Sequence, residues 1–221
     1  MGLRIKLDDT NFSHYIGISK DINHPNLIGY YNFDSSGVVR NLVTGEVVRK
    51  VGNPIFGENF VQITGLDGLI DDALVTSGNI SYVAIANAGA AAMICGHIDY
   101  DVSPPTGDAI LRNTKFTLLC NNATLTEVDT RTAAVRFVAG VIGDTTKDLY
   151  VSNAGALVKT SGTKTSGNPN TVPFHMGGHS ANNVLPQQTT LYSVAVFNTA
   201  LLQTEVNDFY TQFKGLFPQT S

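Results

Sequence analysis

Short apolar runs separated by turn residues are the main pattern of this chain. The runs are rich in Val, Ile, Thr, Tyr and Phe, and 21 Gly and 8 Pro punctuate the sequence. The pattern predicts short β-strands over the following ranges: Leu3–Leu7, Leu27–Asp34, Phe60–Ile63, Ser81–Ala86, Ala91–Asp99, Phe116–Cys120, Thr124–Val128, Val135–Val141, Asp148–Val151, Thr171–Met176 and Thr190–Phe197. So many strands require two stacked sheets. We therefore expect an all-β fold, a two-sheet antiparallel β-sandwich of the jelly-roll kind.

One helix is predicted near the C-terminal end. After Thr199, apolar side chains recur at helical spacing. They are Leu202, Val206, Phe209, Tyr210 and Phe213. Gly215 and Pro218 are expected to end the helix. We expect the stripe to pack on the sandwich rather than to form a ligand site, because such stripes usually serve burial.

Two ranges have patterns that bear on exposure. In Thr190–Phe197, Leu191, Ser193, Ala195 and Phe197 alternate with a second set that is also apolar. Both faces of this strand are therefore expected to be covered.

Residues 159–170 read KTSGTKTSGNPN, which predicts a solvated loop and the most mobile part of the chain.

The length of 221 residues suits one β-sandwich domain. We place this domain over residues 26–221. Residues 1–25 are expected to form a strand and an irregular tail that packs on the sandwich or on another chain. The N-terminal segment is thus a candidate assembly element.

Composition and charge exclude several classes of function. Hydrophobic residues make up 43% of the chain, enough for a sizeable core, and charged residues only 14%, against roughly 25% in typical domains. The net charge of −4 provides no basic field for a nucleic-acid backbone. Nucleic acid is therefore not an expected partner.

The termini and apolar stretches give no sign of secretion or membrane insertion. Met1–Lys6 alternates in charge instead of forming a basic stub before an apolar run, so we expect no signal peptide, and a protein that stays inside the cell or leaves it by lysis. The least polar stretch, Tyr82–Cys95, is too short to span a bilayer. Cys95 and Cys120 lack metal-site spacing and are expected to be buried free thiols.

Three segments carry a resemblance to a known family. They are Leu27–Asp34 with the loops 35–37 and 41–45, Val135–Val141 with Asp148–Gly155, and Phe174–Gly178 with Leu191–Leu201 and Glu205. In this order they resemble the laminin-G-like, or concanavalin A-like, lectin sandwich over residues 27–213. The resemblance implies this fold and a carbohydrate-binding role, although a fold does not by itself determine function.

The sequence departs from the family pattern at two positions. Ala154 is inserted where the family usually has Asn-Gly, and Leu202 occupies the place of a capping Ser or Thr. If Leu202 is the cap, the helix N-terminus is weakened by about 1 kcal/mol. Residues 1–12 also resemble the starts of some phage and prophage tail or virion proteins, which implies a viral source.

Asp99, Tyr100 and Asp101 are the first candidate carbohydrate-binding residues. They gather carboxylates and an aromatic ring at a predicted strand end, near Asp108 and Pro104-Pro105. Carboxylate oxygens suit Ca²⁺, so Asp99 and Asp101 are candidate calcium ligands, and the ring suits a sugar face. The alternative is a polar loop fixed by proline, since the EF-hand spacing is not met. The acidic cluster Asp67, Asp71 and Asp72 can likewise be interpreted as calcium ligands or as part of a polar loop.

Asn121 and Asn122 are the second pair of candidates. Their amides follow the strand Phe116–Cys120 and could read sugar hydroxyls. The alternative is an ordinary hairpin turn. No cofactor other than a possible Ca²⁺ is expected.

Glu127 and Asp129 are the candidates for catalysis. Strand alternation places both carboxylates on one face, as in retaining glucanases of this sandwich fold, which need a pair about 5.5 Å apart. The glucanase motif has a further Glu that is missing here. The chain also has no Trp on which a sugar ring could stack. We therefore expect no catalytic residues.

The histidines and glycine motifs add no chemistry. His97 lies in an apolar strand, and His175 and His179 have strand or loop spacing, which does not favour a zinc site. We interpret all three as structural or surface residues. The G-x-S-x-G, Walker A and G-x-G-x-x-G motifs are absent.

These observations predict a noncatalytic lectin-like virion protein, in the tail or on the particle surface. It would bind cell-surface polysaccharide or a neighbouring virion protein. Weak single sites favour several copies, so a homo-oligomer is expected, through the N-terminal segment or a sheet edge. The alternatives are a purely structural phage protein and a polysaccharide-degrading glycoside hydrolase on the same fold.

Overall fold

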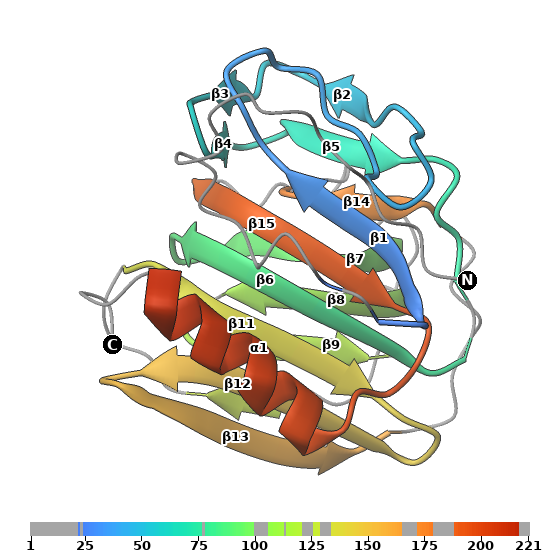
Figure 1. The fold of residues 1–221 in the computed structure, drawn as a ribbon, viewed down its shortest axis with the longest axis vertical. Coiled ribbons are helices and arrows are strands. Elements are labelled where there is room, and N and C mark those ends of the chain that lie inside the picture. Colours follow the sequence, from blue (N-terminus) through green and yellow to red (C-terminus); the bar gives the residue numbers. More distant parts are fainter. Residues whose placement is uncertain are drawn as a thin grey trace.

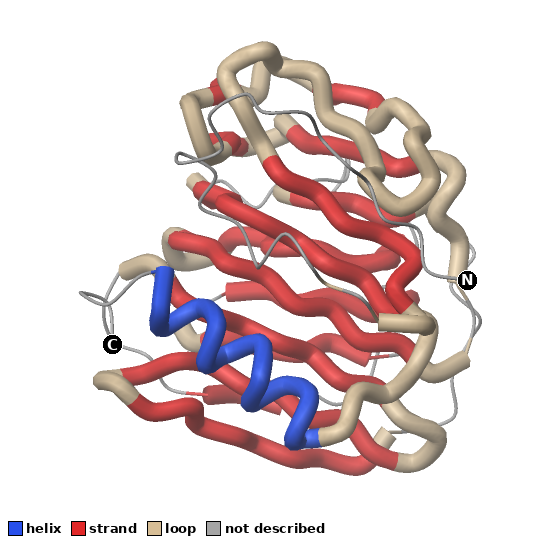
Figure 2. The backbone as a smooth tube through the Cα atoms, in the orientation of Figure 1, coloured by secondary structure: helices blue, strands red, loops and turns tan. Residues whose placement is uncertain are grey.

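The computed structural model describes residues 22, 24–76, 78–99, 106–112, 114–120, 126–128, 134–164, 172–178 and 188–216. The predicted strand Leu3–Leu7 lies outside these residues. So does the rest of the N-terminal segment, residues 1–25, apart from positions 22, 24 and 25. Within the described part, fifteen strands and one helix form two packed antiparallel sheets. The predicted two-sheet β-sandwich with a C-terminal helix is confirmed (Figures 1 and 2).

The first sheet has eight strands. They are β13 (Ala156–Thr163), β12 (Thr146–Asn153), β11 (Arg136–Ile142), β6 (Ile80–Ala88), β15 (Thr189–Phe197), β4 (Val61–Ile63) and β3 (Ile55–Phe56), in this order, with β1 (Leu27–Asn32) also on β15. The outer edge of β15 is shared, because β4 pairs with Thr189–Leu191 and β1 with the part that runs from Ser193 to Phe197. Figure 1 shows β1 and β4 on the same side of β15.

The second sheet has seven strands. They are β10 (Thr126–Val128), β9 (Phe116–Cys120), β8 (Thr106–Arg112), β7 (Ala92–Asp99), β14 (Phe174–Met176), β5 (Gly68–Asp71) and β2 (Arg49–Val51), in this order. The main hydrophobic core lies between the sheets and includes Tyr31, Tyr82, Leu118, Val138 and Phe174. Both cysteines predicted to be buried thiols, Cys95 and Cys120, are buried, and neither forms a disulfide.

The helix α1 (Gln203–Leu216) covers the outer face of the eight-stranded sheet (Figure 1). Val206, Phe209, Tyr210 and Phe213 are buried against it, as the stripe predicted. Leu202 is the exception, since 66% of it is exposed, because it precedes the first helical turn.

The N-terminus of α1 is stabilised by Glu205, although the capping position carries Leu202 instead of Ser or Thr. Glu205 Oε2 accepts a hydrogen bond from the Leu202 backbone N–H at 2.7 Å, which is one half of a capping box. Its Oε1 lies 3.0 Å from Nε2 of His24, and these contacts, opposed by partial burial, leave the pKa of Glu205 below its usual value. The expected weakness of this end is therefore offset.

Both faces of β15 are buried, as predicted, but the alternation is not the one expected. A register shift between Leu191 and Ser193 marks a β-bulge, where an extra residue interrupts the alternation. Leu191 consequently packs in the core between the sheets with Val194 and Val196, whereas Ala195 and Phe197 pack under the helix. The predicted common face for Leu191 and Ser193 was wrong.

The predicted loop over residues 159–170 was also wrong in its first part. Lys159–Thr163 belongs to β13, which pairs with β12 over its whole length, and residues 165–170 lie outside the described part of the chain. Ala154 and Gly155 join the two strands with φ angles of 47° and 82°, as a type I′ hairpin turn requires. A polar strand at a sheet edge has one solvated face, so its sequence resembles a loop.

Gly140 marks a close approach between the sheets. A Cβ on this residue would lie 2.7 Å from Leu118 Cδ1 and 3.2 Å from Ile110 Cγ1. Both neighbours are fully buried, so neither can move aside without repacking the core.

Replacing Gly140 by Ala should therefore lower the free energy of unfolding by about 1–3 kcal/mol through overpacking. Urea unfolding followed by circular dichroism measures this change. Gly143→Ala is the matched control, because its Cβ would meet no atom closer than 3.4 Å. Equal stabilities of the two variants would contradict the predicted close approach.

Candidate functional site

A pocket of about 430 Å³ opens beside β1. It is an open hollow at the surface rather than an enclosed cavity. Four separate segments line it: β1, the loop after Asn41, the loop after β5 and the end of β15. The lining residues are Leu27, Ile28, Val43, Thr44, Leu74, Val75, Thr76 and Asn198.

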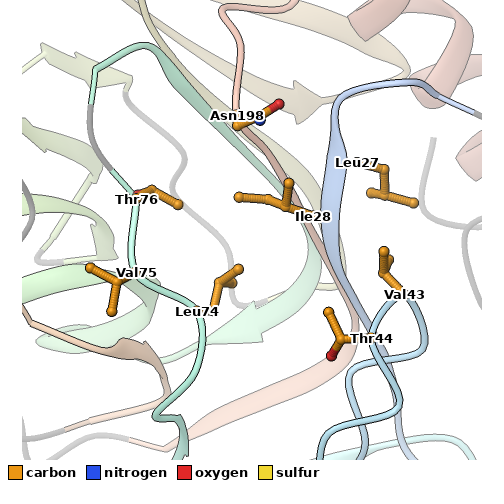
Figure 3. Close-up of a pocket in the computed structure, with 8 residues that line it drawn as sticks. All are labelled: Leu27, Ile28, Val43, Thr44, Leu74, Val75, Thr76 and Asn198. Atoms are coloured by element: carbon orange, nitrogen blue, oxygen red, sulfur yellow. The ribbon is translucent and has the colours of Figure 1, made fainter.

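Figure 3 shows how the lining is arranged. Leu74, Val75 and Thr76 form one side, and Leu27, Val43 and Thr44 lie on the other, with Ile28 between them. The two sides come from different sheets, because the first segment follows β5 and the second belongs to β1 and its adjoining loop.

Asp71, at the end of β5, holds the first side in place. Only 2% of this residue is exposed, yet its carboxylate accepts four hydrogen bonds. Oδ2 receives the Tyr31 hydroxyl at 2.7 Å and the Asn41 amide at 3.1 Å, and Oδ1 receives the backbone N–H groups of Ala73 and Leu74, each at 3.1 Å. Burial, together with the charge of Asp71, raises the pKa of Tyr31 well above its usual value, so this hydroxyl stays a donor.

Asn41 fixes the second side. Its Oδ1 accepts from the backbone N–H groups of Tyr30 at 3.4 Å and Val43 at 3.0 Å. Its Nδ2 donates to the Ile28 carbonyl at 3.2 Å as well as to Asp71. One buried amide therefore ties the loop that carries Val43 to β1 and to the opposite side.

His97 fixes the carbonyl of Leu74 from within the core. The ring is fully buried, with Nδ1 2.8 Å from the Tyr82 hydroxyl and Nε2 3.1 Å from the Leu74 oxygen. A neutral ring with its proton on Nε2 satisfies both contacts, and burial lowers the pKa of His97 to about 4. The Phe174 backbone N–H also donates to the Leu74 oxygen, at 3.2 Å.

The side chains that line the pocket are uncharged, and polar surface contributes to the lining almost as much as apolar surface. None of the eight lining residues is ionisable. Thr76 is only 7% exposed, and its Oγ1 is buried without a hydrogen-bond partner. Asn198 is exposed and offers an amide that donates and accepts. The pocket thus combines aliphatic side chains with the polar side chains of Thr44 and Asn198, while the Thr76 oxygen is buried behind the surface.

The structure places only some of the residues predicted from sequence. Asp99 ends β7, half-buried and opposite Thr106. Tyr100, Asp101, Asn121 and Asn122 lie outside the described residues, so their role in carbohydrate or calcium binding stays a prediction. No group of three potential metal-ligating side chains occurs among the residues that the structure describes.

The structure places Asp108, which follows the predicted cluster at Asp99–Asp101, in a strand. It lies within β8, opposite His97 and Cys120, and is buried. Burial and the neighbouring Asp108 carboxylate raise the pKa of Cys120 to about 12. The strand β8 was not predicted, because Gly107 and Asp108 interrupt the apolar pattern at its start.

The acidic cluster Asp67, Asp71 and Asp72 is divided among three roles. Asp67 accepts from the backbone N–H of Asn53 at 2.9 Å, and Asp72 forms a two-pronged ion pair with Arg49 on the surface at 2.7 and 2.8 Å. Asp71 alone of the three is buried. The cluster does not form a common ligand set.

Other candidates are resolved only in part. His97 is structural, as predicted, whereas His179, Asp129 and the side chain of Glu127 lie outside the described part of the chain. Sequence reasoning missed Asn41, Thr76 and Asn198. Only the loop from Asn41 to Gly45 offered a signal, since Asn and Gly are typical turn residues. No helix in the described part has the length and apolarity needed to cross a membrane.

Comparisons with known proteins bear on the fold. No protein-family model and no curated protein sequence matches the chain. Among solved structures it is similar to the Trypanosoma rangeli sialidase in complex with sialic acid, with a TM-score of 0.66 and 14% identity over 90% of this chain and 35% of that one. It is also similar to the receptor binding domain of botulinum neurotoxin D, with a TM-score of 0.59 and 13% identity over 86% of this chain and 52% of that one.

The chain therefore spans about a third of the sialidase and half of the toxin domain. At such identities the likeness shows a common fold. It is consistent with the lectin-like β-sandwich that the sequence motifs implied.

Replacing Asp71 by Asn should lower the free energy of unfolding by about 3 kcal/mol or more, because an amide group would face donors in a buried site. Asp72→Asn is the adjacent control. Asp72 is 51% exposed in its ion pair, so its loss should cost under about 1 kcal/mol. Urea unfolding at pH 7 compares the two, and similar losses would contradict the role of Asp71.

His97 should make stability depend on pH. Its pKa in the folded protein, about 4, lies below the ordinary value of 6.5. Between these values the unfolded chain binds more protons, so the free energy of unfolding rises with pH. The contribution is complete above pH 6.5, about 3 kcal/mol, and is lost as pH falls toward 4.

Two measurements check this contribution of His97. NMR titration of the His97 ring should show a neutral imidazole down to about pH 4, and His97→Phe should flatten the rise in stability between pH 4 and 6.5. Titration of the ring near pH 6.5 would refute it, whether or not the variant folds well.

Proposed function

We propose that this protein is a noncatalytic, lectin-like module that binds cell-surface carbohydrate in the pocket beside β1. The observation that carries the proposal is an uncharged pocket whose lining joins aliphatic side chains to the polar side chains of Thr44 and Asn198. Sugars present both C–H faces and hydroxyl groups, so they match such a lining.

The structural neighbours support a role in recognition. One was solved in complex with sialic acid, and the other is a receptor binding domain. The fixed walls add a second argument, because groups already ordered in the free protein need not be ordered on binding.

The pocket is better suited to binding than to hydrolysis. Glycoside hydrolysis needs two carboxyl groups flanking the scissile bond, and none of the eight lining residues is acidic. Glu127 and Asp129 remain the residues to test for the hydrolase alternative. A bound calcium ion at Asp99 and Asp101 also remains part of the proposal.

The finer part of the proposal concerns where the protein acts. The resemblance of residues 1–12 to phage tail and virion proteins supports display on a phage particle, where neighbouring virion proteins are further partners. Several copies of a weak site would give useful avidity, which supports a homo-oligomer. A purely structural virion protein is the competing hypothesis.

A glycan array with the full chain, read with and without EDTA, tests the proposal. Light scattering in parallel gives the mass of the assembly. We expect binding to bacterial surface glycans with no released product. Loss of binding in EDTA would support the calcium ligands Asp99 and Asp101.

A matched pair of variants tests the pocket itself. Val43→Arg should abolish glycan binding, because Val43 lines the pocket and its exposure allows a longer side chain. Val47→Arg is the control, since Val47 is more exposed and lies outside the lining. The absence of binding by a folded assembly would favour the structural alternative. Released product that Glu127→Gln abolishes would favour the hydrolase.

A further inference from the structure

The strand β13 forms a long edge of the eight-stranded sheet. It spans eight residues and, among the residues that the structure describes, pairs with β12 alone. Figure 1 shows no strand beyond it. The strands at the other sheet ends, β3, β2 and β10, have only two or three residues, and the outer side of β1 bonds to the loop at Asn41. Short or covered edges avoid pairing with other chains, whereas a long edge favours it.

The edge of β13 also lacks the features that usually protect such strands. The strand contains no proline, and its register with β12 has no bulge. Its single charge is Lys159, whose Nζ lies 3.1 Å from Asp148 Oδ2 and over the ring of Tyr150. Both partners belong to β12, so this charge is held along the face of the sheet rather than beyond its edge.

Alternate residues of β13 direct their backbone groups outward. The Lys164 N–H donates to the Thr145 oxygen at 2.9 Å. Hydrogen-bonded pairs alternate along an antiparallel ladder, so the even-numbered residues of β13 bond toward β12. The N–H and C=O groups of the odd-numbered residues therefore lie at the edge: Leu157, Lys159, Ser161 and Thr163. The last three of these residues are exposed, so this row is open to a partner strand.

The row is symmetric about Thr160, which suits a second copy of the same strand. Antiparallel pairing about Thr160 places Leu157 opposite Thr163 of the partner subunit and Lys159 opposite Ser161 of the partner subunit. Every outward residue then lies opposite another outward residue, as the hydrogen bonds require. Pairing about Lys159 would place two ammonium groups opposite each other, which is unfavourable. Pairing about Ser161 would place Leu157 beyond the end of the other strand.

We propose that two copies of this chain pair antiparallel through β13, about Thr160, and form one continuous sheet across a two-fold axis. Such a contact uses the same surface on both copies, so it closes as a dimer instead of growing into a fibre. The inference rests on the homo-oligomer of the proposed function and names its contact surface.

This pairing leaves the pocket open in both copies. The pocket lies beside β1, on the opposite side of the eight-stranded sheet from β13 (Figure 1). With strands about 4.8 Å apart, the joined sheet would hold the two pockets on the order of 50 Å apart. Two sites at this spacing can engage one polysaccharide or one cell surface together, which raises the avidity.

Light scattering and a proline substitution test the contact. The full chain should have a mass of twice 23.6 kDa. Ser161→Pro removes an outward N–H but no bond to β12, so it should raise the dissociation constant of the dimer about tenfold or more while the circular dichroism stays that of the folded chain. Ser161→Ala keeps this N–H and is the control.

A cysteine at the two-fold axis tests the register. Thr160 lies opposite its own copy in a pair without hydrogen bonds, where Cα atoms are about 4.5 Å apart, a distance that a disulfide can span. Thr160→Cys should therefore form a covalent dimer on mild oxidation, since the native cysteines are buried. Thr163→Cys is the control, because its two copies would lie on the order of 20 Å apart along the paired strands.

A monomeric chain, a dimer that Ser161→Pro leaves intact, or equal cross-linking of Thr160→Cys and Thr163→Cys would overturn this inference. If such a chain still binds glycans, the proposed carbohydrate site stands without this contact. A dimer that cross-links at Thr160→Cys and binds no glycan would uphold the contact and refute the carbohydrate-binding function.

Discussion

A carboxylate buried between two β-sheets is the constraint on which this structure depends. Asp71 is removed from water, and an ionised group in such a place needs several hydrogen bonds to be tolerated. The four donors come from β1, the loop at Asn41 and the backbone that follows β5. Satisfying this one group therefore sets the relative positions of three segments, and the pocket lies between those same segments.

The second polar link reinforces the first from deeper in the core. His97 and Tyr82 belong to different sheets, and their hydrogen bond joins the sheets beneath the pocket. Phe174 lies against Tyr31, Tyr82 and His97, with ring centroids 5.2–6.0 Å apart. Apolar packing thus surrounds both polar links and excludes the water that would compete with them.

The sequence predicted some strands correctly and missed others, depending on the kind of interaction that forms them. Strands such as Phe116–Cys120, with regular apolar spacing, were predicted correctly, because local alternation and burial agree. The strands β8 and β13 were missed, because their polar residues are either buried by partners distant in sequence, like Asp108, or placed on an edge, like Lys159. The pocket could not be predicted, since its walls come from four segments that meet only in the folded sandwich.

The residues that hold the backbone of the pocket are different from those whose side chains line its opening, and this has an evolutionary consequence. Asp71, Asn41 and His97 hold the backbone, while Val43, Val75 and Asn198 present exposed side chains to the opening. Exposed positions tolerate substitution with little change in stability. Under the proposed function, related chains can therefore acquire different ligand preferences by changing these three side chains, with the scaffold beneath them preserved.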